Sequence, residues 1–417
     1  MAETIPSSGM LSVEEARERV LARFQPLAAE EVALVEALGR VLAEDAIARE
    51  ASPPFANSAM DGYALRASDT AGATDGSPVG LRLAGEVPAG SVYAGEAAPG
   101  EAVRILTGAP IPDGADAVIQ QELVSVADGV VSLAAPVAVG NNIRAAGGDA
   151  RPGTLLARAG TELGPPEIAL LASLGVAPAR VTRRPRVAIL ATGDELQPLG
   201  TPLRPGQIHD SNTPYLTAAV LRAGATPVTL GIARDREDDL RAKLDAAAGC
   251  DLLLTSGGVS VGDYDLVKRM LTESGSMAFW RVRVKPGKPL AFGERNGIPV
   301  LGLPGNPVSA AVTFELFGRP AIRRMLGAAQ VERPVVEVVY EGRDLKRSDR
   351  REFVRVRLYS HAGRLVARDT GEQESHLISS LRGATALLIA PEGEGFMRSG
   401  ETAHALLLND ALPWGVA

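Results

Sequence analysis

The sequence predicts a multidomain protein in which one α/β domain is combined with two β-rich domains. Residues 185–326 alternate strand-like and helical segments, which is typical of a mainly parallel sheet. Residues 52–151 are rich in Gly, Pro and Val, in short segments typical of an all-β module. The β pattern returns from about Pro334. A chain of 417 residues accommodates roughly three domains.

Composition narrows the function classes. The formal net charge is −7 and no segment forms an extended basic face, which argues against broad nucleic-acid binding. An anionic substrate therefore has to be met by local cations. Cys250 is the only cysteine, so neither an intramolecular disulfide nor a cysteine metal cluster can form. No apolar run is long enough to span a bilayer and the first ten residues lack a secretory pattern, which makes a cytoplasmic protein without membrane contact the default expectation.

The N-terminal region predicts a helical unit that a β domain interrupts. Ser12 and Glu15 form a capping-box pattern at the start of a helix whose apolar stripe reaches Phe24. A second helix is predicted at about 29–38, because a glycine follows it. The helical pattern returns at 163–174. The predicted domains are 1–51 with 152–184 (helical linker), 52–151 (inserted β domain), 185–328 (α/β domain) and 329–417 (C-terminal β domain).

The α/β domain is predicted from regularly alternating elements. Ligands of such sheets bind at the carboxyl ends of the strands, and the polar motifs of this region all follow strands. The predicted strands are Arg186–Ala191, Thr226–Ile232, Asp251–Thr255, Ala278–Val284 and Val300–Leu303, and the predicted helices are Thr213–Ala223, Asp238–Ala248, Leu266–Leu271 and Val308–Phe317.

The C-terminal region predicts a small closed or sandwich-like β domain. Its clearest strand is Glu352–Leu358, which alternates strictly between two faces. Further strands are predicted at Ala386–Ala390 and Ala403–Leu408. In the first strand, one face carries Val354, Val356 and Leu358, and the other carries Phe353, Arg355 and Arg357.

The stretch Ser256–Asp265 is the strongest single functional motif. Its glycines, among them Gly257 and Gly258, permit tight turns and a close approach to a ligand. Ser256 and Ser260 add hydroxyl donors, and the following helix offers free N–H groups to an anion. The two acids at its end, Asp263 and Asp265, suggest a divalent metal between protein and phosphate.

Other polar motifs follow neighbouring strands. Asp194 and Glu195 lie on a tight turn after the first strand. Asp210 precedes a helix, where capping that helix is as good an explanation as ligand binding. The Leu303–Ser309 motif closes a strand and opens a helix, with Pro307 at the first helical position.

The segment from 281 to 288 concentrates four cations. By the two-residue period of a strand, Arg281, Arg283 and Lys285 share one face. A solvated edge strand guarded by charge is the structural alternative. The Pro-Gly turn brings Lys285 and Lys288 near one another, which favours anion binding. The four histidines have no metal-ligand spacing.

Taken in order, these motifs resemble the molybdopterin molybdenumtransferase family, the MoeA-type enzymes that also occur as the C-terminal domain of gephyrin. Weaker similarity at Arg350–Arg355 and Ser375–Leu381 extends the resemblance almost to the end of the chain. The matching stretches are Pro53–Ala64, Arg104–Ala109, Ala191–Leu196, Gln207–Asn212, Ser256–Gly262, Lys285–Pro289 and Leu303–Ser309.

The resemblance implies a subunit of four parts: a helical linker domain, an inserted β domain, a doubly wound molybdopterin-binding α/β domain and a C-terminal β-barrel. It implies a homodimer whose cleft lies between the α/β domain of one subunit and the inserted domain of the other. The implied reaction inserts molybdate into adenylyl-molybdopterin and releases AMP, with Mg²⁺ or a similar cation. A transient contact with the molybdopterin adenylyltransferase is also expected.

The resemblance assigns roles residue by residue. The expected catalytic residues are Asp61, Thr107, Asp149, Glu195, Lys285 and Lys288. The expected substrate-binding residues are Ser256, Gly257, Gly258, Ser260, Pro304, Gly305, Asn306, Pro307, Ser309, Arg350 and Ser375. The expected metal ligands are Asp210, Asp235, Asp265 and Glu195.

Two departures and two alternatives accompany the resemblance. Some relatives carry lysine where this chain has Arg281, and the loop after Gly262 is one residue shorter, which leaves Asp263 and Asp265 as candidates for one acid. A molybdopterin adenylyltransferase is the enzymatic alternative, but it lacks the Pro53–Ala64 segment and the C-terminal β domain. A receptor-clustering scaffold of the gephyrin type is the non-enzymatic alternative.

Overall fold

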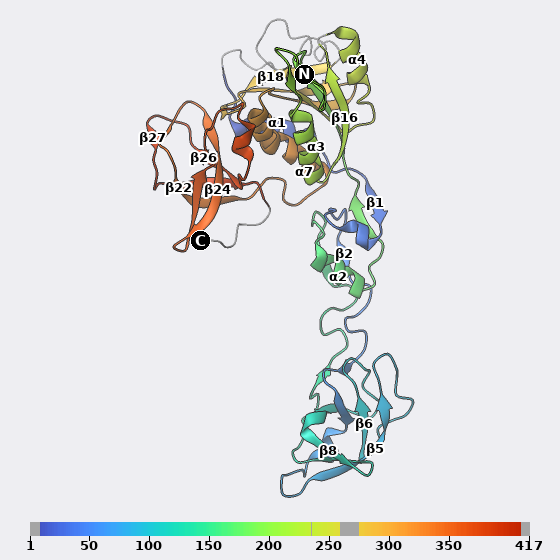
Figure 1. Ribbon diagram of the computed structural model, residues 1–417. Helices are drawn as coiled ribbons and strands as arrows, with labels where there is room; N and C mark the ends of the chain where they lie inside the picture. The colour runs from blue at the N-terminus through green and yellow to red at the C-terminus, as the bar shows by residue number, and fades with distance from the viewer. Residues whose placement is uncertain (1–8, 235, 259–274, 410–417) are drawn as a thin grey trace.

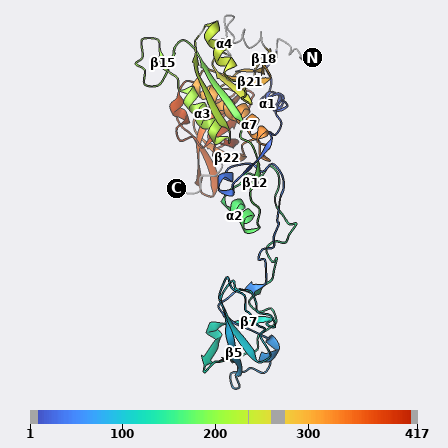
Figure 2. The same cartoon turned by 90° about the vertical axis from the view of Figure 1, so that its right-hand side faces the viewer.

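The computed structural model describes residues 9–234, 236–258 and 275–409. Figure 1 and Figure 2 show an elongated molecule. The inserted β domain lies at one end, the α/β domain and the C-terminal barrel lie at the other, and a narrow linker joins them. The predicted combination of an α/β domain with β domains is confirmed. Within the described parts of the chain, no helix has the length and apolar character needed to cross a membrane.

The α/β domain is built on a six-stranded sheet with the order β16-β13-β17-β21-β20-β18. The first four of these strands are parallel and the last two are antiparallel. Its strands are β13 (Arg186–Thr192), β16 (Thr226–Ala233), β17 (Leu252–Ser256), β18 (Gly275–Arg281), β20 (Pro289–Arg295) and β21 (Ile298–Leu303), and its helices are α3 (Asn212–Arg222), α4 (Glu237–Asp245), α6 (Pro307–Thr313) and α7 (Arg319–Met325). A π-helical turn (Phe314–Gly318) joins α6 to α7.

Both faces of this sheet are covered, because alternate residues of each strand point to opposite sides. In β13, Val187 and Ile189 belong to the apolar cluster that contains α3, α6 and α7. Ala188 and Leu190 belong to a second cluster with Leu240 of α4. The doubly wound arrangement is therefore confirmed, with an antiparallel edge that the sequence pattern does not reveal.

The predicted strand at Ala278–Val284 is wrong in its second half. β18 ends at Arg281, and the chain then forms β19 (Val284–Lys285), which pairs with β24 (Arg351–His361) in the sheet of the C-terminal barrel. Arg283 lies between these two pairings. Its N–H donates to Leu11 O (2.8 Å), and its carbonyl accepts from Arg351 N (3.1 Å). The two halves of the segment pair in two different sheets. One strand face is therefore not shared by Arg281, Arg283 and Lys285.

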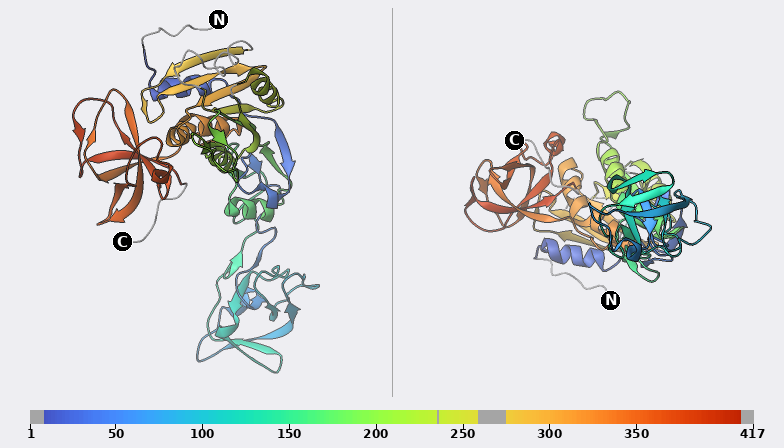
Figure 3. Two further views of the ribbon diagram at one scale, coloured as in Figure 1. Left: turned by 45° about the horizontal axis from the view of Figure 1, so that its top comes forward. Right: turned by 90° about the horizontal axis from the view of Figure 1, so that it is seen from below.

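The N-terminal helix α1 (Val13–Leu21) carries the predicted capping box. Glu15 N donates to Ser12 Oγ (3.1 Å), and Ser12 N donates to Glu15 Oε2 (2.7 Å). Although the sequence assigns this helix to the linker, its buried side chains pack in the core of the α/β domain. Figure 3 shows the helix lying beside that domain. The buried residues of α1 are Val13, Ala16 and Val20.

The predicted helix at 29–38 is wrong. Ala29–Val32 forms strand β1, which pairs antiparallel with β12 (Ala179–Thr182), and a 3₁₀ turn (Leu34–Ala37) follows. The partner strand lies about 150 residues away in sequence, so local helix propensity gives no sign of it. The linker also contains the predicted helix α2 (Pro165–Ser173) and the paired strands β2 (Ala46–Ile47) and β11 (Leu155–Ala157).

The inserted domain contains a six-stranded sheet with the order β7-β4-β6-β5-β9-β8. Its strands are β4 (Gly62–Leu65), β5 (Val79–Val87), β6 (Glu101–Ile105), β7 (Ala117–Gln120), β8 (Val124–Ala127) and β9 (Val130–Leu133). Alternate residues such as Leu65 and Ala64 enter two separate apolar clusters, one on each face. Both faces of the curled sheet are therefore buried.

The C-terminal domain is a closed barrel, because β26 pairs with both β28 and β24. The order is β24-β25-β22-β28-β26, and its strands are β22 (Val335–Glu341), β24 (Arg351–His361), β25 (Arg364–Asp369), β26 (Ala386–Ala390) and β28 (Thr402–Leu407). The predicted alternation in β24 is confirmed: Val354 and Val356 fill the barrel. The opposite face is buried in its first part, since Phe353 packs in the α/β core and Arg355 is fully buried, whereas Arg357 is exposed.

We expect Val20→Ala to lower the free energy of unfolding of the α/β domain by about 1.5–3 kcal/mol, because it removes two buried methyl groups and leaves a cavity. Urea unfolding followed by Trp280 fluorescence in a Trp414→Phe background measures this, since Trp280 lies in the same cluster as Val20. Arg19→Ala, on the exposed side of the helix, is the matched control. Equal midpoints for the two variants would contradict the assignment of α1 to this core.

Candidate functional site

The candidate site begins where three parallel strands end at one edge of the sheet. Ala191 of β13 lies beside Ser256 of β17, and Ser256 lies beside Leu303 of β21. The polar motifs that follow these strands therefore start in one row. Gly257 N donates to Leu303 O (3.1 Å), which ties the glycine loop to the Pro304 loop. The sequence prediction that these loops meet is confirmed for the part of the glycine loop that the structure describes.

The side-chain amide of Asn212 links these loops. Its Nδ2 donates to Ser256 Oγ (2.7 Å) and to Gly305 O (2.7 Å), and the residue is buried at the start of α3. An amide nitrogen has two protons, so both bonds can form at the same time. Sequence reasoning placed Asn212 in a matching motif but gave it no role. The sequence feature that could have indicated this role is an amide side chain directly after Asp210 and Ser211, the two possible capping residues.

Gly257 is required by its surroundings. It has a φ of +92°, and a Cβ there would lie 2.8 Å from both the carbonyl oxygen and Oγ1 of Thr192. Any larger residue would push the loop away from β13. The first turn of the glycine loop is thus held against the neighbouring strand by backbone contact alone.

The two described acids among the expected metal ligands lie on adjacent parts of this edge. Ile208 N donates to Glu195 O (2.9 Å), and Asp210 N donates to Gln197 O (3.0 Å), so the Glu195 and Asp210 segments run side by side. Asp210 Oδ1 accepts from Thr213 N (3.0 Å), which is the helix-capping role that sequence reasoning weighed against ligand binding. Its second carboxylate oxygen makes no hydrogen bond within the described chain.

Several expected site residues lie on parts of the chain that the structure does not describe. Ser260, Asp235, Asp263, Asp265 and the predicted helix at 266–271 lie outside the described residues. Among the residues that are described, no three His, Cys, Asp or Glu side chains form a group able to hold a metal. Carboxylates at this edge are nonetheless the oxygen donors that Mg²⁺ prefers, so the donor chemistry of Glu195 and Asp210 fits that ion.

The C-terminal barrel contributes to the same region. Lys285 pairs in register with Glu352 of β24, and its Nζ lies 3.0 Å from Glu352 Oε2. Arg350 directly precedes this pairing, so the strands bring it close to Lys285 in the backbone ladder. Lys288 is exposed and has no ion pair within the described chain. Sequence reasoning missed Glu352, because nothing in one sequence indicates which strand lies beside Lys285.

Ser375 joins the barrel to the start of α6. Asn306 Nδ2 donates to Ser375 Oγ (3.0 Å), and Val308 N donates to Ser375 O (3.1 Å). Ser309 is buried in the first turn of the same helix. Asn306 and the first turn of α6 therefore meet a segment from the barrel domain.

The expected catalytic residues of the inserted domain form a separate group. Thr107 donates to Asp61 Oδ1 from both its backbone N–H and its hydroxyl (2.7 Å each). The hydroxyl bond, followed by the backbone bond, lowers the pKa of the Asp61 carboxyl below its ordinary value. Asp149 is exposed, and its N–H donates to Ser52 O (2.9 Å).

Within one chain this group does not join the edge of the α/β sheet. Asp61 directly precedes β4 and Thr107 follows β6, and the domain that contains these strands lies at the far end of the molecule from β18 (Figure 1). The expected site residues thus fall into two sets, one at each end of the elongated chain. Hydrogen bonds join Asp61 to Thr107 in one set, and they join Ser256 to Gly305 through Asn212 in the other.

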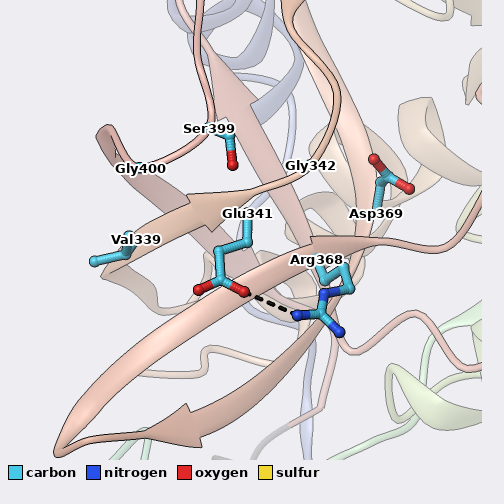
Figure 4. Close-up of a pocket in the computed structure, with 7 residues that line it drawn as sticks. All are labelled: Val339, Glu341, Gly342, Arg368, Asp369, Ser399 and Gly400. Carbon is cyan, nitrogen blue, oxygen red and sulfur yellow. Dashed lines mark hydrogen bonds and ion pairs between the residues drawn. The ribbon is translucent and has the colours of Figure 1, made fainter.

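A cavity of about 640 Å³ lies in the barrel domain, away from both sets (Figure 4). It is lined by Val339, Glu341, Gly342, Arg368, Asp369, Ser399 and Gly400. The Arg368 guanidinium donates to Glu341 Oε2 (2.9 Å) and lies 5.1 Å from the centre of the Tyr359 ring. Because Arg368 is already paired with Glu341, this cavity offers an anion no unpaired arginine. The candidate site therefore stays at the edge of the α/β sheet.

Comparison with known proteins identifies similar chains. Three family models match successive parts of the sequence: the MoeA N-terminal region (domains I and II) at residues 11–175, a probable molybdopterin binding domain at 188–324 and the MoeA C-terminal region (domain IV) at 339–408. The chain is 37% identical to a molybdopterin molybdenumtransferase of Haemophilus influenzae, over 94% of this chain and 97% of the relative.

Two further similarities span almost the whole chain. A protein of Mycobacterium tuberculosis named molybdopterin molybdenumtransferase 2 is 39% identical, over 92% of this chain and 96% of its own length. The crystal structure of a molybdopterin biosynthesis moeA protein from Pyrococcus horikoshii is 33% identical and superposes with a TM-score of 0.82, covering 96% of this chain and 100% of that one. Fold and sequence similarity therefore agree over all of the domains.

We expect Thr107→Val to raise the pKa of the Asp61 carboxyl towards its ordinary value, because the variant loses the hydroxyl bond that lowers this pKa most. NMR titration of the full chain with ¹³C-labelled aspartate measures this pKa, and Asp61→Asn assigns the signal. Arg104→Gln is the matched control, since Arg104 acts on Asp61 only through weaker charge attraction. A larger pKa rise in Arg104→Gln than in Thr107→Val would refute the hydrogen-bond explanation.

Proposed function

The chain belongs to the molybdopterin molybdenumtransferase family, the MoeA-type proteins, and on that premise we propose that it inserts molybdate into adenylyl-molybdopterin and releases AMP. A transferase role in molybdenum cofactor biosynthesis follows from the family. The observation that carries the finer proposal is the convergence of two strand-end loops, joined by Asn212, with Ser375 of the barrel domain and with Lys285, which pairs with the barrel.

Charge supports an anionic substrate at this edge. Molybdate is a dianion, and adenylyl-molybdopterin contains a pyrophosphate. Lys285, Lys288 and Arg350 would neutralise these oxygens, and Ser309 and Ser375 would donate hydrogen bonds. Lys285 is now paired with Glu352, so its ammonium is held in one direction before an anion arrives. Such preorganised positive charge stabilises developing negative charge at little reorganisation cost.

A divalent cation belongs to the same proposal. Asp210 and Glu195, together with Asp235 and Asp265, would hold Mg²⁺ near the phosphates. When bound, Mg²⁺ would withdraw electron density from the phosphate oxygens and make AMP a better leaving group. The protein's own part is to present these carboxylates on adjacent segments, which the pairing of the Glu195 and Asp210 segments supports.

The two separated sets of residues support a homodimer. In this proposal Asp61 of the partner subunit, with its Thr107 and Asp149 neighbours, completes the site at the α/β edge. The linker exposes apolar side chains that such an interface would cover. Exposed apolar surface of this kind often marks a protein–protein contact. The exposed apolar residues of the linker are Val35 (83% exposed), Leu38 (55%), Ile47 (41%) and Leu155 (40%).

The partners and location follow the same reasoning. A transient contact with the molybdopterin adenylyltransferase would deliver the adenylylated pterin, and the reaction would take place in the cytoplasm. The alternative activity, adenylylation of molybdopterin by ATP, is tested by an assay that contains pterin and Mg-ATP but no molybdate. AMP-pterin formation in that assay would favour the alternative.

We expect the Lys285→Ala/Lys288→Ala double variant to lose molybdenum insertion by at least about a hundredfold, because each lysine contributes charge-assisted bonds to the anion. AMP release from adenylyl-molybdopterin and molybdenum bound to the pterin product are the two measurements. Wild-type rates in the double variant would remove the cationic part of the mechanism. Lys346→Ala, an exposed lysine of the barrel, is the control.

Mixing inactive variants tests whether the site combines two subunits. Asp61→Asn and Lys285→Ala homodimers should each be inactive, whereas mixed dimers contain one intact site. With random subunit exchange we expect about a quarter of the wild-type rate, since half the dimers are mixed and each has one working site of two. No recovery after verified exchange would mean that Asp61 and Lys285 do not act together across subunits.

We expect the Val35→Lys/Leu38→Lys double variant to be monomeric at concentrations at which the wild-type chain is dimeric, because two buried ammonium groups would oppose the interface. Sedimentation velocity measures the change. Val92→Lys is the matched control, since Val92 is 79% exposed in the inserted domain and lies outside the linker. Dissociation by Val92→Lys alone would move the interface to another surface.

A further inference from the structure

Arg355 is a fully buried cation that has no carboxylate partner at bonding distance among the described residues. Its Nε donates to Ser380 Oγ (3.1 Å), and its Nη2 donates to Glu374 O (3.4 Å). Its Nη1 is buried and has no hydrogen-bond partner within the described chain. Burial lowers the pKa of this guanidinium to about 10, so it remains charged at neutral pH. A buried charge of this kind is costly, which calls for an explanation in structure or function.

The segment 370–380 folds around this residue. Arg355 N donates to Gln373 Oε1 (2.9 Å), and Arg355 O accepts from Gln373 Nε2 (3.2 Å) and from Thr370 Oγ1 (3.2 Å). The single proton of the Thr370 hydroxyl can alternatively be donated to Ser380 O (2.5 Å), a contact that closes the segment on itself, while Thr370 N still donates to Arg355 O (3.1 Å). The backbone and side chain of one β24 residue therefore hold the beginning, the middle and the end of the segment.

Apolar burial contributes little to holding this segment. Between residues 371 and 380 only Ser380 is buried, and the rest are exposed or half-buried. A segment with so little buried surface would open easily without specific polar contacts. The hydrogen bonds to Arg355 are consequently the main restraint on the side that faces the barrel.

The other side of the segment reaches the candidate site. Its 3₁₀ turn (Ile378–Leu381) lies against α6, and Ser375 bonds to Asn306 and to Val308 N. The carbonyl that Arg355 holds, Glu374 O, belongs to the peptide unit that directly precedes Ser375. Fixing that carbonyl orients the peptide plane and therefore restricts the position of Ser375.

We propose that Arg355 is a positioning residue that holds the 370–380 segment so that Ser375 stays at the start of α6, at the edge of the substrate site. Arginine suits this role because its planar fork reaches the Ser380 hydroxyl and the Glu374 carbonyl at once, whereas lysine has a single ammonium. The consequence for catalysis depends on the proposed function, but the restraint on the segment does not.

Hydrogen exchange of the full chain tests the restraint directly. In Arg355→Met we expect amides within residues 371–381, including those of Leu377 and Ser380, to exchange about tenfold faster or more, since bonds to a charged donor are lost. Arg355→Lys should give an intermediate rate. Arg364→Met, an exposed arginine of β25, should leave the segment unchanged. Unchanged exchange in folded Arg355→Met would overturn the proposal.

Ser380→Ala provides a second test if Arg355→Met does not fold. It removes one acceptor of the guanidinium and leaves the charge in place, and it should also speed exchange at residues 371–381. Wild-type exchange in this variant, together with wild-type exchange in Arg355→Lys, would equally overturn the proposal.

Kinetics then test the link to the site. Arg355→Met should raise the KM for adenylyl-molybdopterin more than it lowers kcat, and to the same extent as Ser375→Ala. The double variant should be no worse than either single variant, because both changes remove the same placement of Ser375. Additive losses would contradict the positioning role. If wild-type protein shows no insertion at all, the proposed function fails while the exchange result still decides the role of Arg355.

Discussion

The candidate site depends on the buried amide of Asn212, which bonds to Ser256 and Gly305 at once. These two residues end neighbouring strands, so the strands bring them near one another but do not fix their loops. A net contribution of about 1 kcal/mol for each neutral hydrogen bond is small, yet an unsatisfied buried partner would cost more than that. The amide therefore determines how the loops meet, while the apolar faces of the sheet determine only that they are neighbours.

The barrel domain packs on the α/β core through Phe353, Leu387 and Leu406, and it completes the site edge through polar contacts. Lys285 is directed by Glu352, and Asn306 is joined to Ser375. Both barrel residues belong to β24 or to the segment that folds over it. One strand of the barrel thus has an apolar face that fills its own core and a polar edge that orients groups in another domain. Phe353 and Arg355, on the face opposite Val354 and Val356, are buried for this reason.

Sequence patterns predicted the elements whose causes are local. The capping box of α1, the β13 strand and the alternation of β24 depend on residues within a few positions of one another. The wrong predictions concern elements that depend on distant partners. β1 forms because β12 lies beside it, and the predicted strand is divided near Arg283 because its two ends pair in different sheets. In the site, sequence motifs named Ser256, Asn306 and Ser375 but not the residues that position them. A partner such as Glu352 becomes visible only when the strand register is known.

The division of the expected site between two ends of the chain has an electrostatic consequence. Asp61 carries its negative charge at neutral pH, and the bonds from Thr107 hold that carboxylate in place and lower its pKa below the ordinary value. Exposed charges separated by more than about 10 Å at moderate ionic strength are largely screened, so Asp61 and Lys285 of one elongated chain have little effect on each other. Each set can therefore keep its charge and its local bonds without the other. If two subunits bring the sets together, the acids of the inserted domain meet the cations of the α/β edge only in the assembled cleft, where a substrate excludes water and strengthens every such interaction.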